Sequence, residues 1–399
     1  MNTSMEHISD FAVYLFFAVA LNSDWNANSF LWWGSIAFLI GAYVVSKGLQ
    51  IEFAVTQFKV WMLAFLGICL ISVCFSIDKA NSFNMIISLV VLMTILALLD
   101  DKIQTKGQLE KCMKLLAMAI FTMMIYLVFT VDLIVFQLVQ RGLAESGRWN
   151  GNDIGMKCSI FLLLSVYFFD TDNRVLVRIG LLAASALALL LLYYTASRTA
   201  LLITLIGFGL YFYFKYPSRR FLNILVIIAA SCAVLGLSLS IPKLYDVIGW
   251  RIEGAIAAAL GRGNADHSAL LREEYIQVGM KAFKKSPVIG YGIDSFRFLN
   301  FQKTGRLTYS HNNFVEILTG VGCVGFVAYY FYYIMLAADF LYVYHRREVS
   351  LMLNIAAACF FSMWIVHFFF IAYYDLLPNL LILFFAKALV LFGEKGDKI

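Results

Sequence analysis

The chain has 399 residues, of which 62% are hydrophobic and only 14% are charged, with a mean hydropathy of +0.81. A soluble domain carries about 25% charged residues, so this composition excludes an ordinary soluble protein. The net charge of +6 lies mainly in short loops between apolar segments. It is therefore no sign of nucleic-acid binding, and no nucleic-acid partner is expected.

Apolar stretches long enough to cross a bilayer recur along the whole chain. There are about 12 of them by length, which predicts an all-α polytopic membrane protein. A cleavable signal peptide is not expected, because the N-terminus lacks a basic region and a small-residue cleavage site. The predicted spans are 8–22, 28–46, 58–76, 82–99, 112–137, 153–169, 175–196, 199–215, 221–241, 313–343, 350–374 and 377–393.

One long polar gap interrupts this series, from Pro242 to Ser310. It divides the chain into three parts. Residues 1–241 would hold nine membrane helices, residues 242–310 a large loop containing helices, and residues 311–399 the last three membrane helices. A mostly lipid-soluble bundle with one large polar loop is typical of a membrane enzyme that works at one face of the bilayer.

Basic residues predict which face that is. With twelve spans, most Lys and Arg of the short loops fall on one side, which should be cytoplasmic and should hold both termini. The large loop then faces the extracytoplasmic side. Two Lys within spans, Lys157 and Lys387, lie near span ends and are able to snorkel. The basic loop residues are Lys47, Lys59, Lys102, Lys106, Lys111, Lys114, Arg174, Arg178, Lys215, Arg219, Arg220, Arg346, Arg347, Lys395 and Lys398.

Two arginines on the opposite side oppose this charge bias. Arg148 lies in a Gly- and Asn-rich turn close to the membrane. Arg198 lies in the short polar stretch between two spans, where Ser197 is expected to cap the next helix. A helix N-terminus beside an Arg is suited to binding an anion, whereas the alternative is an Arg that snorkels to lipid headgroups.

The large loop contains one clear amphipathic helix pattern, from His267 to Lys285. Arg272 falls in the middle of its apolar arc. A burial-prone Arg needs an anionic partner. The partner would be Asp294 or Glu253 in an internal salt bridge, or a lipid phosphate, whose oxygens suit the planar guanidinium.

After this helix the sequence has a Gly-rich turn around Tyr291, which is expected to bring backbone close to another element. The chain then re-enters the membrane at residues 311–318 (HNNFVEIL), where Asn313 and Glu316 have the spacing of an N-terminal cap. The positive end of the helix dipole disfavours imidazolium, so His311 should be neutral and able to accept a proton.

Several other motifs are set aside. Residues 320–325 match G-x-G-x-x-G, but they follow no strand and lie in an apolar segment, so a dinucleotide site is not expected. Small residues there would let helices pack closely. Seven Cys lie in or beside apolar spans without metal-ligand spacing. No cofactor and no metal site are predicted.

The pattern resembles the O-antigen polymerase and O-antigen ligase superfamily. The matching pieces are residues 197–200 (SRTA), 271–275 (LREEY), 287–292 (PVIGYG) and 311–318 (HNNFVEIL), followed by Gly322 and Gly325. The resemblance covers roughly residues 140–330. The predicted number of spans also agrees with the family's usual count of about 12 membrane helices.

The resemblance implies a GT-C-like membrane enzyme that transfers a glycan without a metal ion and inverts the anomeric centre. The donor would be a glycan on undecaprenyl pyrophosphate in the bacterial inner membrane, and the active site would lie on the extracytoplasmic side. Arg198 and Arg272 would bind the pyrophosphate, with Arg148 as a further member, and His311 would be the base. Asn312, Asn313 and Tyr291 would contact the substrate, and a chain-length regulator would be a protein partner.

Three functions remain open. A polymerase would transfer the glycan to another lipid-linked repeat unit of an O-antigen or capsule-type polysaccharide, and we favour this reading. A ligase would use the lipid A core as the acceptor. A lipid-linked sugar transporter would instead have ionisable residues near mid-membrane and an internal repeat, and the sequence has neither feature.

Overall fold

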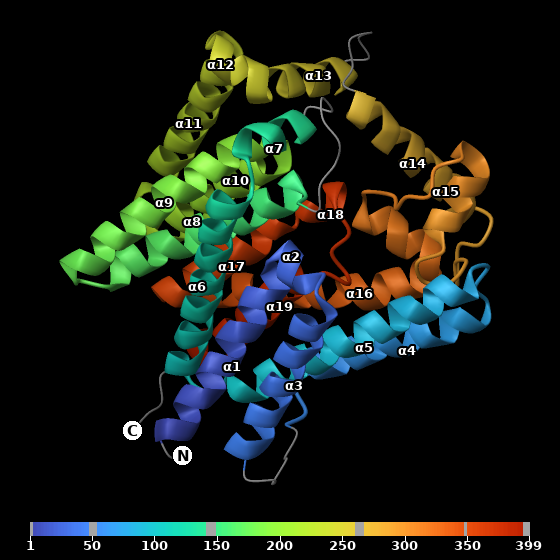
Figure 1. The fold of residues 1–399 in the computed structure, drawn as a ribbon, viewed down its shortest axis with the longest axis horizontal. Coiled ribbons are helices and arrows are strands. Elements are labelled where there is room, and N and C mark those ends of the chain that lie inside the picture. Colours follow the sequence, from blue (N-terminus) through green and yellow to red (C-terminus); the bar gives the residue numbers. More distant parts are fainter. Residues whose placement is uncertain (1–2, 48–53, 141–148, 260–266, 347–348, 394–399) are drawn as a thin grey trace.

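The computed structural model describes residues 3–47, 54–140, 149–259, 267–346 and 349–393. These residues form helices and connecting segments, with no strand among them (Figure 1). Helices preceding the large loop are α1 (Thr3–Leu21), α2 (Ser23–Asn26), α3 (Ser29–Ser46), α4 (Gln57–Cys74), α5 (Lys79–Lys102), α6 (Lys106–Thr130), α7 (Leu133–Gln140), α8 (Gly151–Thr171), α9 (Val175–Thr195), α10 (Arg198–Lys215) and α11 (Arg220–Ser240), with a 3₁₀ turn at Pro217–Arg219.

The large loop is itself helical. It contains α12 (Pro242–Leu244), a π-helical turn (Tyr245–Gly249), α13 (Trp250–Ala259), α14 (His267–Phe283) and α15 (Phe296–Thr304). The chain continues with α16 (Asn313–Arg346), α17 (Leu351–Met363), α18 (Val366–Phe369) and α19 (Leu376–Gly393). In Figure 1 the first turn of α1 lies at the bottom left, and α12 to α15 lie on the opposite side of the molecule.

Ten helices of the described residues are long and apolar enough to cross a membrane. The all-α polytopic fold is therefore confirmed. Helices also form at the two remaining predicted spans, where α1 packs on α3 and α6, and α10 packs on α8 and α17. The central helices α8, α17 and α19 are mostly buried, whereas α9 and α11 present largely exposed apolar surfaces. Exposed apolar surface of this kind is expected where lipid surrounds the helix, because lipid tails are as apolar as the side chains.

Two predicted spans have different boundaries in the structure. The span 112–137 is divided, because Asp132 interrupts the apolar run and accepts hydrogen bonds from the backbone N–H groups of Ile134 and Val135. Helix α6 therefore ends at Thr130 and α7 begins at Leu133. The span 350–374 ends as a helix at Met363, and the short α18 and an irregular segment follow it.

Ion pairs join the helix ends at the side of the molecule that we call the basic end. There Lys59 pairs with Asp101, the Lys387 Nζ lies 2.9 Å from an Asp100 carboxylate oxygen, and Lys215 lies 2.6 Å from Asp170. Lys59 and Lys215, two of the basic loop residues, thus lie at this end. Which membrane face this end adopts remains a prediction. We call the opposite side, with α12 to α15, the loop end.

Lys157 and Lys387 do not snorkel, although their positions near span ends would allow it. Both side chains are buried, Lys387 beside Asp100 and Lys157 between Asp153 at 2.6 Å and the Leu21 carbonyl at 2.8 Å. A buried ammonium is stable only with such partners, and these partners come from distant parts of the chain or from the preceding helical turn.

Helix α16 is broken at Gly322, whose φ of 63° and ψ of −165° are not helical. The segment 287–292 runs along the break. The Tyr291 and Gly292 N–H groups donate to the carbonyls of Thr319 and Gly320, and the Cys323 N–H donates to the Pro287 carbonyl at 2.8 Å. A Cβ on Gly322 would lie 2.2 Å from the Val288 oxygen, so glycine is required there.

This break corrects one detail of the sequence analysis and confirms another. The glycines at 320–325 do not lie within a continuous helix, and at Gly322 they admit a loop rather than a neighbouring helix. The Gly-rich turn does bring backbone close to another element, as predicted, and that element is α16. The freed backbone groups of the break find partners in the loop, which satisfies them in an apolar setting.

Candidate functional site

Helix α14 packs its predicted apolar face on the first half of α16. Tyr275 is buried together with Phe296 and Val315, and a Cβ on Gly279 would lie 2.2 Å from a Val315 methyl group. The amphipathic arc read from the sequence is therefore confirmed. Because Arg272 lies three residues before Tyr275, both side chains leave α14 on neighbouring positions of this face.

His311 lies against this face of α14. Its ring is stacked on Tyr275 with 6.1 Å between ring centroids and 15° between planes, and the Tyr309 ring lies 4.2 Å away on centroids. Burial and then the Arg272 guanidinium lower the pKa of His311 to about 4. The imidazole is thus neutral at pH 7, as the sequence predicts, although the causes are burial and Arg272.

The backbone at His311 is held in an uncommon conformation, with a φ of 54°. Glu316 accepts a hydrogen bond from the Ser310 N–H at 2.9 Å, and the Ser310 hydroxyl donates to the Asn312 carbonyl at 2.8 Å. A non-glycine residue in the left-handed region persists only where its surroundings hold it, and such residues cluster at functional sites. The position of His311 is therefore built by its neighbours.

Asn312 caps α16. Its side-chain oxygen accepts from the Val315 N–H at 3.0 Å, so the predicted cap is present but one residue earlier than Asn313. Asn313 is fully buried, and its side-chain oxygen accepts from the Ala372 and Tyr373 N–H groups. Its amide nitrogen lies 3.0 Å from His367 Nδ1. In this conformation Asn313 therefore ties α16 to the segment that follows α18.

Arg198 begins α10. Ser197 caps that helix by accepting from the Ala200 N–H at 3.3 Å, as predicted, and Ala196 ends α9 with a φ of 49°. The Arg198 guanidinium donates to the Arg251 carbonyl, and the Arg251 guanidinium donates to the Ala196 carbonyl at 3.0 Å. Arg198 thus turns toward α13 of the loop, contrary to simple snorkelling.

Arg251 is a residue that the sequence analysis did not single out. Its signal was present, because it is a further Arg in the loop and follows Trp250, over whose ring its guanidinium lies at 5.8 Å. Its partner Ala196 lies 55 positions away in the chain. A contact over that separation cannot be found from periodicity or capping patterns.

Helix α18 connects the two arginine regions. The Arg272 guanidinium carbon lies 6.0 Å from the centre of the Phe369 ring, and α10 contacts α18. The structure therefore places Arg272 near enough to His311 to lower its pKa, and α18 contacts both Arg272 and the helix that Arg198 begins. Arg148 lies outside the described residues. Tyr291 lies in the loop along the α16 break, where its carbonyl accepts from the Ile77 N–H at 3.1 Å.

Asp294 and Glu253, the two carboxylates considered as partners of Arg272, contact other residues in the structure. Asp294 pairs with Arg297 at 3.2 Å, and Glu253 accepts a hydrogen bond from the Tyr245 hydroxyl. Burial raises the pKa of Asp294 to about 6, against the opposing effect of Arg297. Among the residues that the structure describes, no group of three His, Cys, Asp or Glu could hold a metal ion.

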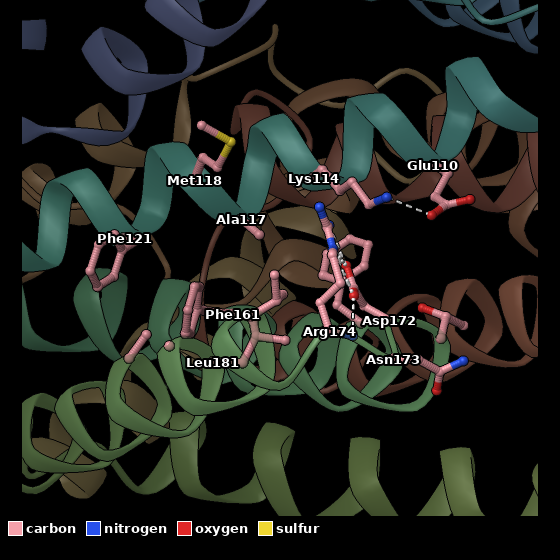
Figure 2. Close-up of a pocket in the computed structure, with 15 residues that line it drawn as sticks. Glu110, Lys114, Ala117, Met118, Phe121, Phe161, Asp172, Asn173, Arg174 and Leu181 are labelled. Atoms are coloured by element: carbon pink, nitrogen blue, oxygen red, sulfur yellow. Dashed lines mark hydrogen bonds and ion pairs between the residues drawn. The ribbon is translucent and has the colours of Figure 1, made fainter.

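A cavity at the basic end contrasts with this region. It has a volume of about 680 Å³ and lies between α6, α8 and α9 (Figure 2). Among its lining residues Lys114 pairs with Glu110 at 2.7 Å and Arg174 pairs with Asp172, and Phe121 and other apolar side chains also line it. Its described charges thus neutralise each other in adjacent pairs, and His311 and Arg272 lie at the other end.

The fold and this site define a multi-pass membrane protein in which the helical loop packs against a half-buried, neutral histidine near an arginine. Residues 183–330 match the family model Wzy_C, described as O-antigen ligase. The match includes α10, the large loop and the first half of α16, and it contains Arg198, Arg272 and His311. The resemblance to the O-antigen polymerase and ligase superfamily is confirmed over these residues. No curated protein matches the chain.

Proposed function

We propose that the protein is an inverting, metal-independent glycosyltransferase that polymerises oligosaccharide repeat units linked to undecaprenyl pyrophosphate. The observation that carries this proposal is the contact between a neutral His311 and the Arg272-bearing face of α14, inside the segment that matches the O-antigen ligase family. The site would face the extracytoplasmic side of the bacterial inner membrane, with both termini in the cytoplasm. This orientation follows from the charge bias of the loops.

The proposed chemistry has one bond-forming and one bond-breaking event. An acceptor hydroxyl gives its proton to His311 Nε2 or Nδ1, and its oxygen attacks the anomeric carbon of the donor sugar. The bond from that carbon to the pyrophosphate oxygen breaks, and the pyrophosphate leaves with the electron pair. A positioned base contributes about 10²–10⁴-fold to such a step.

Arg272, Arg198 and Arg148 would bind the departing pyrophosphate. Negative charge grows on its bridging oxygen as the bond breaks, and each fixed donor at such a position can contribute about 3–4 kcal/mol. Arginine suits this role because its fork binds two phosphate oxygens at once. These cations would take the part that a metal ion plays in other glycosyltransferases, so activity is expected to survive EDTA.

The closeness of Arg272 and His311 also suggests an order of events. An imidazole with a pKa of about 4 is a weak base, and the Arg272 charge is one cause of that weakness. Pyrophosphate bound to Arg272 would offset this charge and raise the pKa of His311. His311 would therefore become a stronger base when the donor is bound. In the empty site its pKa would stay low, so His311 would not take up a proton before transfer can occur.

A ligase is the second candidate, because the matching family model is described as O-antigen ligase. The same residues would serve it with the lipid A core as the acceptor. The experiment that separates them mixes purified protein with a lipid-linked repeat unit alone. A polymerase makes a ladder of products without lipid A, whereas a ligase makes no product until the lipid A core is added and then joins a single unit to that core. A protein regulator of chain length would change the ladder's length distribution.

A further inference from the structure

A second cavity lies beside His311, at the loop end. It has a volume of about 570 Å³ and is bounded by α1, α3, α5, the start of α8 and the segment around residues 370–376. Tyr309 lines it, and the same Tyr309 ring is 4.2 Å from the His311 ring on centroids. The cavity is therefore separated from the proposed base by a single side chain.

The lining of this cavity has two chemically different parts. Its polar part carries Asn150, Asp153, Lys157 and Asp375, and Tyr374 lies with them. Its other wall is formed by apolar side chains of α3 and α5, among which Trp33 and Ile87 are exposed on the outer surface of the bundle. The apolar side chains of this wall are Trp32, Trp33, Ile87, Val91, Leu92 and Ile95.

The charges of the polar part disfavour a phosphate. The Lys157 ammonium is already held by Asp153 at 2.6 Å and by the Leu21 carbonyl at 2.8 Å. Asp375 adds a further carboxyl, one oxygen of which accepts from the Leu377 N–H at 3.0 Å. Carboxylates and an amide beside aromatic rings instead suit hydroxyl or amine groups, which donate hydrogen bonds to them.

The carboxyl of Asp375 is suited to sugar hydroxyls in a further respect. Burial, and then the nearby Asp153, raise the pKa of Asp375 to about 7, while Lys157 acts in the opposite direction. Near neutral pH this carboxyl therefore exists in both protonation states. It can accept a hydrogen bond from one hydroxyl, or donate one when protonated.

We propose that this cavity holds the acceptor, a short glycan carried on a single lipid. The sugar at its reacting end is neutral or bears an amine and lies against Asp375 and Asn150, while the apolar wall of α3 and α5 receives the part next to the lipid. This placement rests on the proposed transferase function and deepens it. It also favours the polymerase, because a lipid A core rich in phosphate finds few available cations on this lining.

Ser88 offers a way to obstruct the cavity without disturbing the core. It lines the cavity from α5, its residue is exposed, and its hydroxyl donates to the Asn84 carbonyl at 3.1 Å. Thr94 is a matched control on the same helix, since it is also exposed, donates to the carbonyl four residues earlier at 2.8 Å and does not line the cavity. Ser88→Trp and Thr94→Trp therefore differ mainly in which surface they enlarge.

The test uses full-length protein in nanodiscs with a fixed amount of long lipid-linked glycan as the donor and a titrated single repeat unit as the acceptor. Ser88→Trp is expected to raise the acceptor KM at least tenfold while the KM for the donor stays within about twofold. Thr94→Trp should behave as wild type. As a second variant, Asp375→Asn keeps the shape and removes the charge, and a lost hydrogen bond to a charged group corresponds to roughly tenfold or more in acceptor KM.

The outcomes separate this inference from the proposed function. If wild-type protein transfers glycan but neither Ser88→Trp nor Asp375→Asn changes acceptor KM, the acceptor binds elsewhere and the transferase function stands. If both variants change donor KM instead, the cavity serves the donor and our assignment is overturned. If wild-type protein transfers no lipid-linked glycan to any acceptor, the function itself fails.

Discussion

The two ends of the bundle hold their charges in different ways. At the basic end Lys59, Asp100, Asp101 and Lys387 form a buried network of opposite charges that joins three membrane helices. At the loop end the His311 ring is stacked on Tyr275 and lies beside the tilted Tyr309 ring, and the Arg198 guanidinium donates to a backbone carbonyl of the loop. Carboxylates neutralise the Lys charges of the buried network, whereas the Arg251 carbonyl orients the Arg198 side chain toward the loop.

This difference teaches where to expect structural and where to expect functional consequences. Breaking the basic network should unfold the protein without altering the chemistry of any molecule that remains folded. Changing His311 or Arg272 should leave the fold intact and impair transfer. Each prediction below would strengthen or break this division, and the largest expected effect comes first.

His311→Ala should reduce glycan transfer by about 10²–10⁴-fold, because a positioned base typically contributes that much. Initial rates on a lipid-linked repeat unit would measure it. His345→Ala is the control, since His345 is exposed near the far end of α16 and bonds only locally to the Leu341 carbonyl in the described structure. Full activity of the His311 variant would remove the proposed base.

Lys59→Met should destabilise the protein by about 3–5 kcal/mol, because it removes the cation beside the buried Asp101 carboxylate. Thermal unfolding in detergent, followed by size-exclusion chromatography, measures this loss. Lys114→Met removes a surface pair with Glu110 and should cost about 0–1 kcal/mol. Equal stability of the two variants would contradict a structural role for the buried network.

Arg272→Lys should lower kcat/KM by about 10–100-fold, since the two-pronged contact with phosphate oxygens is lost while the charge stays. Arg306→Lys is a matched control, because Arg306 lies in the same loop and pairs with Glu274 at the surface at 3.1 Å. A near-normal rate for Arg272→Lys would make Arg272 a surface charge of the loop.

The smallest expected effect is a shift of the acid limb in the pH profile of transfer. The pKa of His311 is about 4 in the free protein, so kcat/KM should stay level from pH 8 to about pH 5 and fall near pH 4. Donor binding to Arg272 should raise that pKa, so the acid limb of kcat should lie at a higher pH than that of kcat/KM. Coincident limbs would argue against the coupling of Arg272 and His311.

The same pKa makes a prediction for stability. Because the pKa of His311 is lower in the folded chain than the roughly 6.5 of an unfolded His, the unfolded chain takes up a proton first as pH falls. The stabilising contribution is therefore complete above about pH 6.5 and is lost progressively toward pH 4. Rates at low pH thus need a parallel check of folding.

Features set by local sequence were predicted well. The apolar arc of α14, the Ser197 cap and the all-α membrane fold each depend on residues a few positions apart. The cap of α16 was placed one residue too late because Asn312 and Asn313 are chemically equivalent candidates, and only the packing of Asn313 against the residue 372–373 backbone separates them.

Features set by distant residues could not be predicted. Lys387 pairs with Asp100, and Arg198 donates to the Arg251 carbonyl, so the burial of Lys387 and the orientation of Arg198 emerge only with the fold. The break at Gly322 is similar, because an apolar Gly-rich run also suits close helix packing. The break forms because segment 287–292 packs against α16 at Gly322 and hydrogen-bonds to its backbone there.

That break has a consequence for anyone who would exchange parts between related enzymes. Backbone hydrogen bonds connect residues 287–292 to α16 on both sides of Gly322. A chimaera joined at residue 310 would take the segment 287–292 from one protein and α16 from the other. The α16 carbonyls at the break would then lose their hydrogen-bond partners in an apolar setting. A segment exchanged between related enzymes therefore has to extend through residue 325, so that it includes the broken stretch of α16 as well as the polar loop.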